Sequence, residues 1–229
     1  MNNKPIKAYA PKARQAFKEA MRQRLTQFGI TAESDQPSAA CKVDTPTVTG
    51  QVMQVADNTY DASLYPALNQ LGHRAKQTPY DALVEALAYT WFNRFCALRY
   101  MEIHDFLDHG LRVLSHPSQP GRFQILEHAQ DVAEDLGLDR NRVIDLKLAN
   151  KDEVLFRELL LGQCHQLHET MPFLFEALDD DTELMLPDNL TRTDSILRAL
   201  VDDIPEQDWD NVEIIGWLYQ FYISEKKDQ

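Results

Sequence analysis

Residues 79–107, PYDALVEALAYTWFNRFCALRYMEIHDFL, form the longest strongly patterned stretch of the chain. Two rows of apolar residues run through this stretch, each with a spacing of four. The first row is Leu83, Leu87, Trp91 and Phe95, and the second is Val84, Ala88, Phe92 and Cys96. On a helix the two rows lie side by side and make one broad apolar face. The stretch therefore predicts a mainly α, multi-helix domain around a long central helix at about 79–107.

Arg94 and Arg99 stand among the large hydrophobic residues of this predicted helix. A half-buried arginine is usually paired with a carboxylate. We therefore expect internal carboxylate partners for both side chains. Contact with a polyanion is the alternative.

The N-terminal residues 1–30 predict a basic amphipathic helix. Its apolar stripe is Ala13, Phe17, Met21 and Leu25. Arg14, Lys18 and Arg22 make a parallel basic stripe one residue away. Two interpretations stay open: a solvated face beside a docking face, or a stripe that contacts phosphates or a partner.

Residues 31–60 are rich in Thr, Ser, Ala, Gln and Pro and have no helical stripe. They predict a linker or a short β arm. Thr47–Val55 has the valines of a short strand or hairpin arm, although Gly50 weakens that prediction. Residues 61–229 predict a helical domain.

Three local signals refine the helical part of the chain. Asp139 predicts the N-cap of a short helix. Thr191 to Asp194 resembles a capping box, with Asp in place of Glu, and predicts another helix start. Pro172 predicts a kink in the long helical stretch 151–177.

The composition limits the classes of function. The 229 residues carry 36 acids and 23 bases, and the formal net charge is −13. Such a chain is a poor candidate for wrapping nucleic acid by itself. The bases are concentrated near the start, however, where residues 1–25 hold seven bases and one acid. Three widely spaced cysteines and the lack of a membrane-length apolar run lead us to expect a cytoplasmic protein.

Motifs for catalysis or cofactor binding are missing from the sequence. His165, His168 and Glu169 are the only cluster of metal-ligand types, but the histidines stand three apart, and ordinary helix packing is the favoured interpretation. A helical metalloenzyme built on them is kept as an alternative. The eight glycines are all isolated, so they build no phosphate loop or dinucleotide fingerprint. We predict no catalytic, cofactor-binding or metal-binding residue in this chain.

Longer phrases carry a family resemblance. They are KAYAPKAR (7–14), AYTWFNRFCALRYMEIHDFLDHG (88–110), RVLSHP (112–117), FRELLLGQCHQLHETMPFLFE (156–176), LMLPDNLTRTDSILRALVDDIPEQDW (184–209) and EIIGWLYQFYISEKKD (213–228). In this order they resemble the N-terminal region of the adenine-specific DNA methyltransferases of bacterial BREX phage-defence systems, the PglX family.

The resemblance implies that family members continue into a catalytic core. That core binds S-adenosylmethionine and flips an adenine onto a motif of Asn or Asp, two prolines and an aromatic residue. None of the eleven prolines here is adjacent to another, so no active-site residue can be carried over. We expect the chain to be a piece of such a protein that stops near the start of the core. A naturally separate module is the alternative.

Two functional hypotheses follow from the resemblance and the charge. The first is an N-terminal accessory domain that supports the downstream methyltransferase core, double-stranded DNA binding by the full-length protein and assembly with other BREX proteins. Its candidate DNA-binding residues are Arg14, Lys18, Arg22, Arg94 and Arg99. The second is a free-standing acidic helical module that binds proteins and makes no DNA contact.

Overall fold

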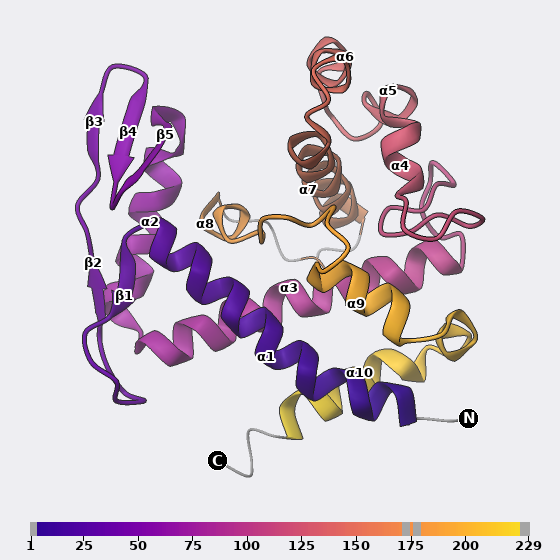
Figure 1. The fold of residues 1–229 in the computed structure, drawn as a ribbon, viewed down its shortest axis with the longest axis horizontal. Coiled ribbons are helices and arrows are strands. Elements are labelled where there is room, and N and C mark those ends of the chain that lie inside the picture. The colour runs from indigo at the N-terminus through magenta and orange to yellow at the C-terminus, as the bar shows by residue number, and fades with distance from the viewer. Residues whose placement is uncertain (1–3, 171–174, 176–179, 225–229) are drawn as a thin grey trace. The chain divides into compact units, whose positions relative to one another are not determined.

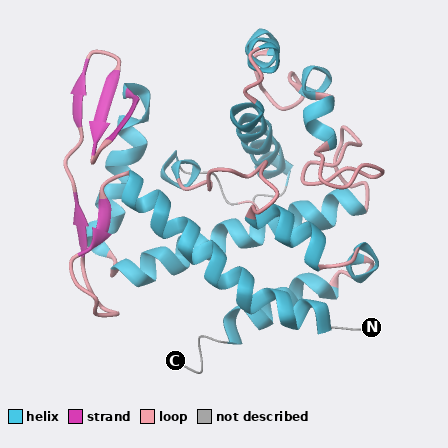
Figure 2. Ribbon diagram, in the orientation of Figure 1, coloured by secondary structure: helices cyan, strands magenta, loops and turns pink. Residues whose placement is uncertain are grey.

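The computed structural model describes residues 4–170, 175 and 180–224 (Figure 1). The α-helices are α1 Lys4–Gln27, α2 Tyr65–Gln77, α3 Tyr80–Ile103, α4 Gln124–Glu127, α5 Ala129–Val132, α6 Arg140–Leu148, α7 Asp152–Thr170, α8 Asp180–Leu184, α9 Ile196–Asp203 and α10 Glu213–Ser224. The 3-10 helices are η1 Ala62–Leu64 and η2 Glu206–Trp209. The strands are β1 Ile30–Ala32, β2 Cys41–Val43, β3 Thr47–Thr49, β4 Val52–Val55 and β5 Asn58–Asp61. The mainly α fold is thus confirmed, and Figure 2 shows how little of the described chain is strand.

Helix α3 is the long central helix that the apolar rows predicted. Every residue of both rows is at most 3% exposed. The helix ends at Ile103, four residues earlier than predicted. The reason is a local cap, because Asp105 has a φ of 56° and the Phe106 N–H donates to the Met101 carbonyl at 2.9 Å. This hydrogen bond and the left-handed residue before it are the marks of a Schellman motif.

The chain folds into two compact units. The first unit contains residues 1–15, 92–177 and 189–229, and the second contains residues 16–91 and 178–188. Helices α1 and α3 each contribute residues to both units. These units group residues by their contacts in space. The predicted division into 1–30, 31–60 and 61–229 follows the order of the sequence and stays a prediction.

The second unit holds all the strands of the described chain. Strands β1 and β2 pair antiparallel, with Ile30 opposite Val43. Strands β3, β4 and β5 form an antiparallel meander in which Met53 lies opposite both Val48 and Tyr60. Gly50 does not weaken a strand, because it lies in the turn between β3 and β4 with a φ of 63°, which favours glycine. Strand β2 and helix α8 both pack against α2.

Helices connected by irregular loops make up the described residues of the first unit, and none of these residues lies in a strand. Helices α4 and α6 pack against α7, and α5 contacts α6. Ring contacts fix its core: Phe92 stacks on Tyr222 with centroids 4.3 Å apart, and Phe123 lies on Phe156 at the same distance. The kink predicted at Pro172 falls outside the described residues. Within the described chain, no helix combines the length and the apolar character that crossing a membrane requires.

Candidate functional site

Two residues of the basic stripe, Lys18 and Arg22, belong to the second unit and face α3. The Lys18 Nζ atom lies 3.0 Å from Oε2 of Glu85, and the Lys18 side chain is 13% exposed. Arg22 is 36% exposed, and its Nη2 atom lies 3.6 Å from Oδ1 of Asp81. The sequence predicts that the basic stripe lies beside the apolar face of α1. It does not reveal that two acids of α3, Glu85 and Asp81, pair with Lys18 and Arg22.

Arg24 is a further basic residue of α1 that lies outside the predicted basic stripe. Its side chain is buried and donates to the Leu184 carbonyl from Nε at 3.1 Å and from Nη2 at 2.6 Å. Its Nη1 atom donates to Asp188 Oδ2 at 2.7 Å. No local sequence pattern predicts these contacts, because the partners are about 160 residues away in the chain.

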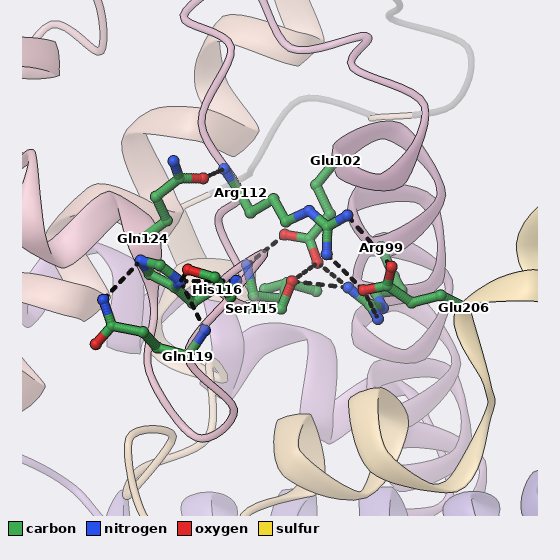
Figure 3. A network of polar contacts seen from close by, with 10 residues as sticks. Arg99, Glu102, Arg112, Ser115, His116, Gln119, Gln124 and Glu206 are labelled. Carbon is green, nitrogen blue, oxygen red and sulfur yellow. Dashed lines mark hydrogen bonds and ion pairs between the residues drawn. The ribbon is translucent and has the colours of Figure 1, made fainter.

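In the first unit, Arg99 of α3 is the centre of a buried polar network (Figure 3). Arg99 is 1% exposed, and its Nη1 atom donates to Glu102 Oε1 at 2.6 Å and to Ser115 Oγ at 2.8 Å. Its Nη2 atom donates to Glu206 Oε1 at 3.3 Å. The expected internal carboxylate partners of Arg99 are therefore confirmed.

Glu102 accepts hydrogen bonds from three directions and has a fully buried side chain. Besides Arg99, the Ser115 hydroxyl donates to it at 2.8 Å and the Leu114 N–H at 2.6 Å. A buried carboxylate is tolerated when such partners satisfy it. Glu102 thus fixes the segment after α3 to the helix itself.

Glu206 of η2 joins the network from another part of the chain. Its Oε1 accepts from Arg112 Nη1, and its Oε2 accepts from Arg112 Nη2 at 3.3 Å. The hydrogen bond from Arg112 lowers the pKa of Glu206, and the charges of Arg112 and Arg99 act in the same direction against a partial burial that raises it. Two positive and two negative side chains therefore balance one another. This arrangement can hold segments in place. Its carboxylates and terminal guanidinium nitrogens are already paired, whereas the buried Nε of Arg99 has no hydrogen-bond partner among the described residues.

His116 stabilises the loop next to this network (Figure 3). Its Nδ1 atom accepts from the Ser118 N–H at 3.1 Å and from the Gln119 N–H at 3.0 Å. The Arg112 N–H donates to Gln124 Oε1 at 2.9 Å across the same loop. Side chains therefore satisfy the backbone groups of a segment that has no regular structure.

The five candidate DNA-binding residues are thus not gathered on one open surface. Arg14, Arg94 and Arg99 are buried, with exposures of 2%, 4% and 1%. The exposed bases in the first residues of α1 are Lys4, Lys7 and Lys12, which lie outside the predicted basic stripe. The signal that could have found them is the lack of any acid before Glu19. DNA binding by the five stays a prediction.

The histidine cluster of α7 does not converge in the described structure. His168 Nδ1 lies 2.6 Å from the Phe175 carbonyl, so it donates there. His165 is exposed. Among the residues that the structure describes, no group of three or more His, Cys, Asp and Glu side chains is placed to hold a metal ion.

Comparison with known proteins gives the family context. No protein-family model matches the chain. The adenine-specific methyltransferase BrxX of Escherichia coli O9:H4 (strain HS) is 54% identical over 230 residues, which cover 100% of this chain and 19% of that protein. The adenine-specific methyltransferase PglX of Lacticaseibacillus casei (strain Zhang) is 32% identical over 244 residues, which cover 100% of this chain and 20% of that protein.

The chain therefore spans about a fifth of the length of the curated relatives that it matches. This share is consistent with the N-terminal region that the sequence resemblance implied. The comparisons confirm that resemblance: over its whole length, this chain is related to a segment of the adenine-specific methyltransferases BrxX and PglX.

Proposed function

We propose that this chain is the N-terminal helical accessory domain of a BREX-type, site-specific adenine-N6 DNA methyltransferase of bacterial phage defence. The observation that carries the proposal is the 54% identity to BrxX, which extends over the whole chain. Because the similarity covers the whole chain, we infer that the chain has the same role as the segment of BrxX that it matches.

Methyl transfer would be the task of the remaining part of the full-length protein. This chain has no adjacent prolines and no paired glycines from which an adenine pocket or a cofactor loop of that class could be built. S-adenosylmethionine is accordingly proposed as the cofactor of the full-length protein and not of this chain.

Calorimetry with S-adenosylmethionine tests this part of the proposal. We expect the full-length protein to bind the cofactor and the 229-residue chain to give no heat of binding. Binding by the chain alone would contradict the accessory role, because a cofactor site would then lie among its helices.

The outer surface of α10 is the proposed packing surface for the methyltransferase core. Leu218 and Tyr222 of this helix are buried, whereas Tyr219 is 46% exposed. Val212, just before the helix, is 60% exposed. Exposed apolar side chains on one segment of the chain favour a contact with another protein surface. The net charge of −13 similarly favours docking of basic surfaces of other BREX proteins.

For the DNA contact, we propose Arg22 as the residue that reaches a phosphate first, and Lys18 as a second that would have to leave its 3.0 Å pair with Glu85 to do so. The Arg22–Asp81 pair is long and exposed at both ends, so it contributes at most about 1 kcal/mol and a phosphate can compete for it. Arg14, Arg94 and Arg99 are buried, and they would act by holding their helices in place.

A salt series of DNA binding tests this contact in the full-length protein. Replacing both residues (K18Q/R22Q) should weaken duplex binding and reduce the slope of log K against log[salt] by up to about 1.8, because each phosphate contact contributes about 0.9. R142Q is the matched control, since Arg142 is 60% exposed and lies elsewhere on the surface of the first unit. Equal affinity and slope for wild type and K18Q/R22Q would remove the DNA role.

The free-standing protein-interaction module remains the second candidate. The net charge of −13 favours it, and so does the pairing of Lys18 and Arg22 with acids of the same chain. A methyltransferase reading frame continuous with this chain would contradict it. It would be supported if the gene ended with this chain and if the K18Q/R22Q variant bound DNA no more weakly than the wild type.

A further inference from the structure

A group of aromatic rings, with two half-buried members and one exposed member, lies at the C-terminal end of α3. We name Tyr100, His104 and Phe106 the aromatic platform. The ring centroids of His104 and Phe106 are 5.5 Å apart with an interplanar angle of 24°, and those of Tyr100 and His104 are 4.3 Å apart. Phe106 is 58% exposed, which is unusual for so large an apolar side chain.

The backbone holds the aromatic platform in place. Asp105 adopts the left-handed conformation, with a φ of 56°, and the Phe106 N–H donates to the Met101 carbonyl. The left-handed region costs a non-glycine residue about 1 kcal/mol or more. His104 Nε2 lies 2.7 Å from the Trp209 carbonyl, so it donates there. The outward position of Phe106 is therefore built into the helix end.

Two exposed aspartates lie beside the aromatic platform in the sequence. Asp105 and Asp108 are exposed, and neither has an ion-pair partner in the part of the chain that the structure describes. The last turn of α3 contains no basic residue to offset the negative end of its helix dipole. The nearby carboxylates Glu102 and Glu206 are, in contrast, both paired with arginines.

We propose that the aromatic platform, with Asp105 and Asp108, is a docking surface for an arginine-bearing segment of a partner protein. A guanidinium is planar, stacks on an aromatic face and forms paired hydrogen bonds with carboxylates. The surface offers both elements within nine residues of sequence, 100–108. Nucleic acid fits it poorly, because its phosphates would meet two unpaired carboxylates. This inference does not rest on the methyltransferase assignment.

The experiment titrates the 229-residue chain with N-acetyl-tetra-arginine amide and with the isosteric citrulline peptide. Binding is followed by the NMR signals of the His104 and Phe106 rings. We expect the arginine peptide to shift both signals and the citrulline peptide to shift neither. F106A should weaken binding about fivefold, the order of an exposed cation–π contact. D105N/D108N should weaken it at least as much, and asparagine tolerates the left-handed conformation at position 105.

Two controls separate docking from general attraction to an acidic protein. L148A removes another exposed apolar side chain of the first unit, 77% exposed, and should leave binding unchanged. E134Q/D135N removes two exposed carboxylates elsewhere in the same unit and should change the affinity much less than D105N/D108N. Equal effects of the two double variants would overturn the proposal. So would a failure of the peptide to bind, or duplex DNA that binds the chain and loses affinity in F106A.

Discussion

The pair of Arg99 and Glu102 shows why this chain can bury charge in an apolar helix. Arg99 is 1% exposed, and the Glu102 side chain is fully buried, so each would be costly alone. Together with Ser115 and the Leu114 N–H they satisfy most of each other's hydrogen-bonding groups, and the Arg99 Nε alone of these lacks a partner among the described residues. The pair therefore positions the segment after α3 more than it adds net stability.

Replacing Glu102 by glutamine should destabilise the chain by about 3 kcal/mol, because breaking a buried pair leaves an uncompensated charge. Urea unfolding followed by circular dichroism measures this change. E158Q is the control: it breaks the Arg142–Glu158 pair, whose arginine is 60% exposed, and should cost at most about 1 kcal/mol. A loss below 1 kcal/mol in E102Q would contradict the assigned role.

Glu206 gives the network a dependence on pH. Its pKa is lowered from 4.5, first by the hydrogen bond from Arg112. A carboxyl group with a lowered pKa in the folded state stabilises the fold above its unfolded pKa and loses this contribution as the pH falls through its folded pKa. The side chain is 50% exposed, so solvent screening keeps the effect small.

We therefore expect the wild type and E206Q to differ in urea midpoint at pH 7 and to converge as the pH falls below about 4.5. A series of urea titrations between pH 7 and pH 3 measures both midpoints. A difference that stays constant over this range would mean that Glu206 acts through its shape and not through its charge.

Two glycines in different helices have opposite roles. A Cβ added at Gly162 of α7 would lie 2.8 Å from the Leu136 carbonyl oxygen, so the glycine allows the chain before α6 to approach the helix closely. A Cβ added at Gly216 of α10 would meet nothing within 4 Å. The first glycine is required by packing, and the second only lowers helix propensity.

Alanine substitutions should accordingly change stability in opposite directions. G162A should destabilise the chain by about 1–3 kcal/mol through the backbone clash. G216A should stabilise it by about 0.5–1 kcal/mol. Thermal unfolding of the two variants beside the wild type measures both changes. A stabilised G162A would show that the turn around Leu136 can move away at little cost.

The helices could be predicted from the sequence where the signal is local or periodic. The apolar rows of α3 are all buried, and Asp139 caps α6 by accepting from the Asn141 N–H at 2.8 Å. The capping prediction at Thr191 was wrong, because Ser195 caps α9. Glu153 instead accepts from the Thr191 hydroxyl at 2.6 Å and from its N–H at 2.9 Å. Glu153 is 38 residues from Thr191, so a local sequence pattern cannot predict this contact.

The candidate site was harder to predict for the same reason. The Arg99–Glu102 pair has a spacing of three on one helix and could be anticipated. Glu206, the second carboxylate of Arg99, lies 107 residues away. The acids opposite Lys18 and Arg22 are likewise distant in sequence, so the basic stripe looked more available than the structure shows it to be.

One short segment, which we call the excursion, belongs to a different compact unit from the residues on either side of it in the sequence. Residues 178–188 belong to the second unit, although the segments before and after them belong to the first. Within the second unit, Arg24 binds this excursion through the Leu184 carbonyl and the Asp188 carboxylate. Buried hydrogen bonds from a charged group contribute about 1.5–3 kcal/mol. Arg24 is therefore a substantial attachment of this segment, beside the Trp91–Thr182 hydrogen bond and the Arg74–Asp181 pair.

Hydrogen exchange can test whether Arg24 is the main anchor. In R24A, we expect amides of residues 182–188 to exchange about ten- to a hundredfold faster, which corresponds to about 1.4–2.8 kcal/mol of lost local stability. Peptides from the first unit should keep their wild-type rates. R22A is the matched control, since Arg22 lies on the same helix but pairs at the surface with Asp81. Equally faster exchange of these amides in both variants would mean that the excursion depends on the stability of α1 as a whole. Faster exchange in R24A alone would show that the buried Arg24 side chain attaches it.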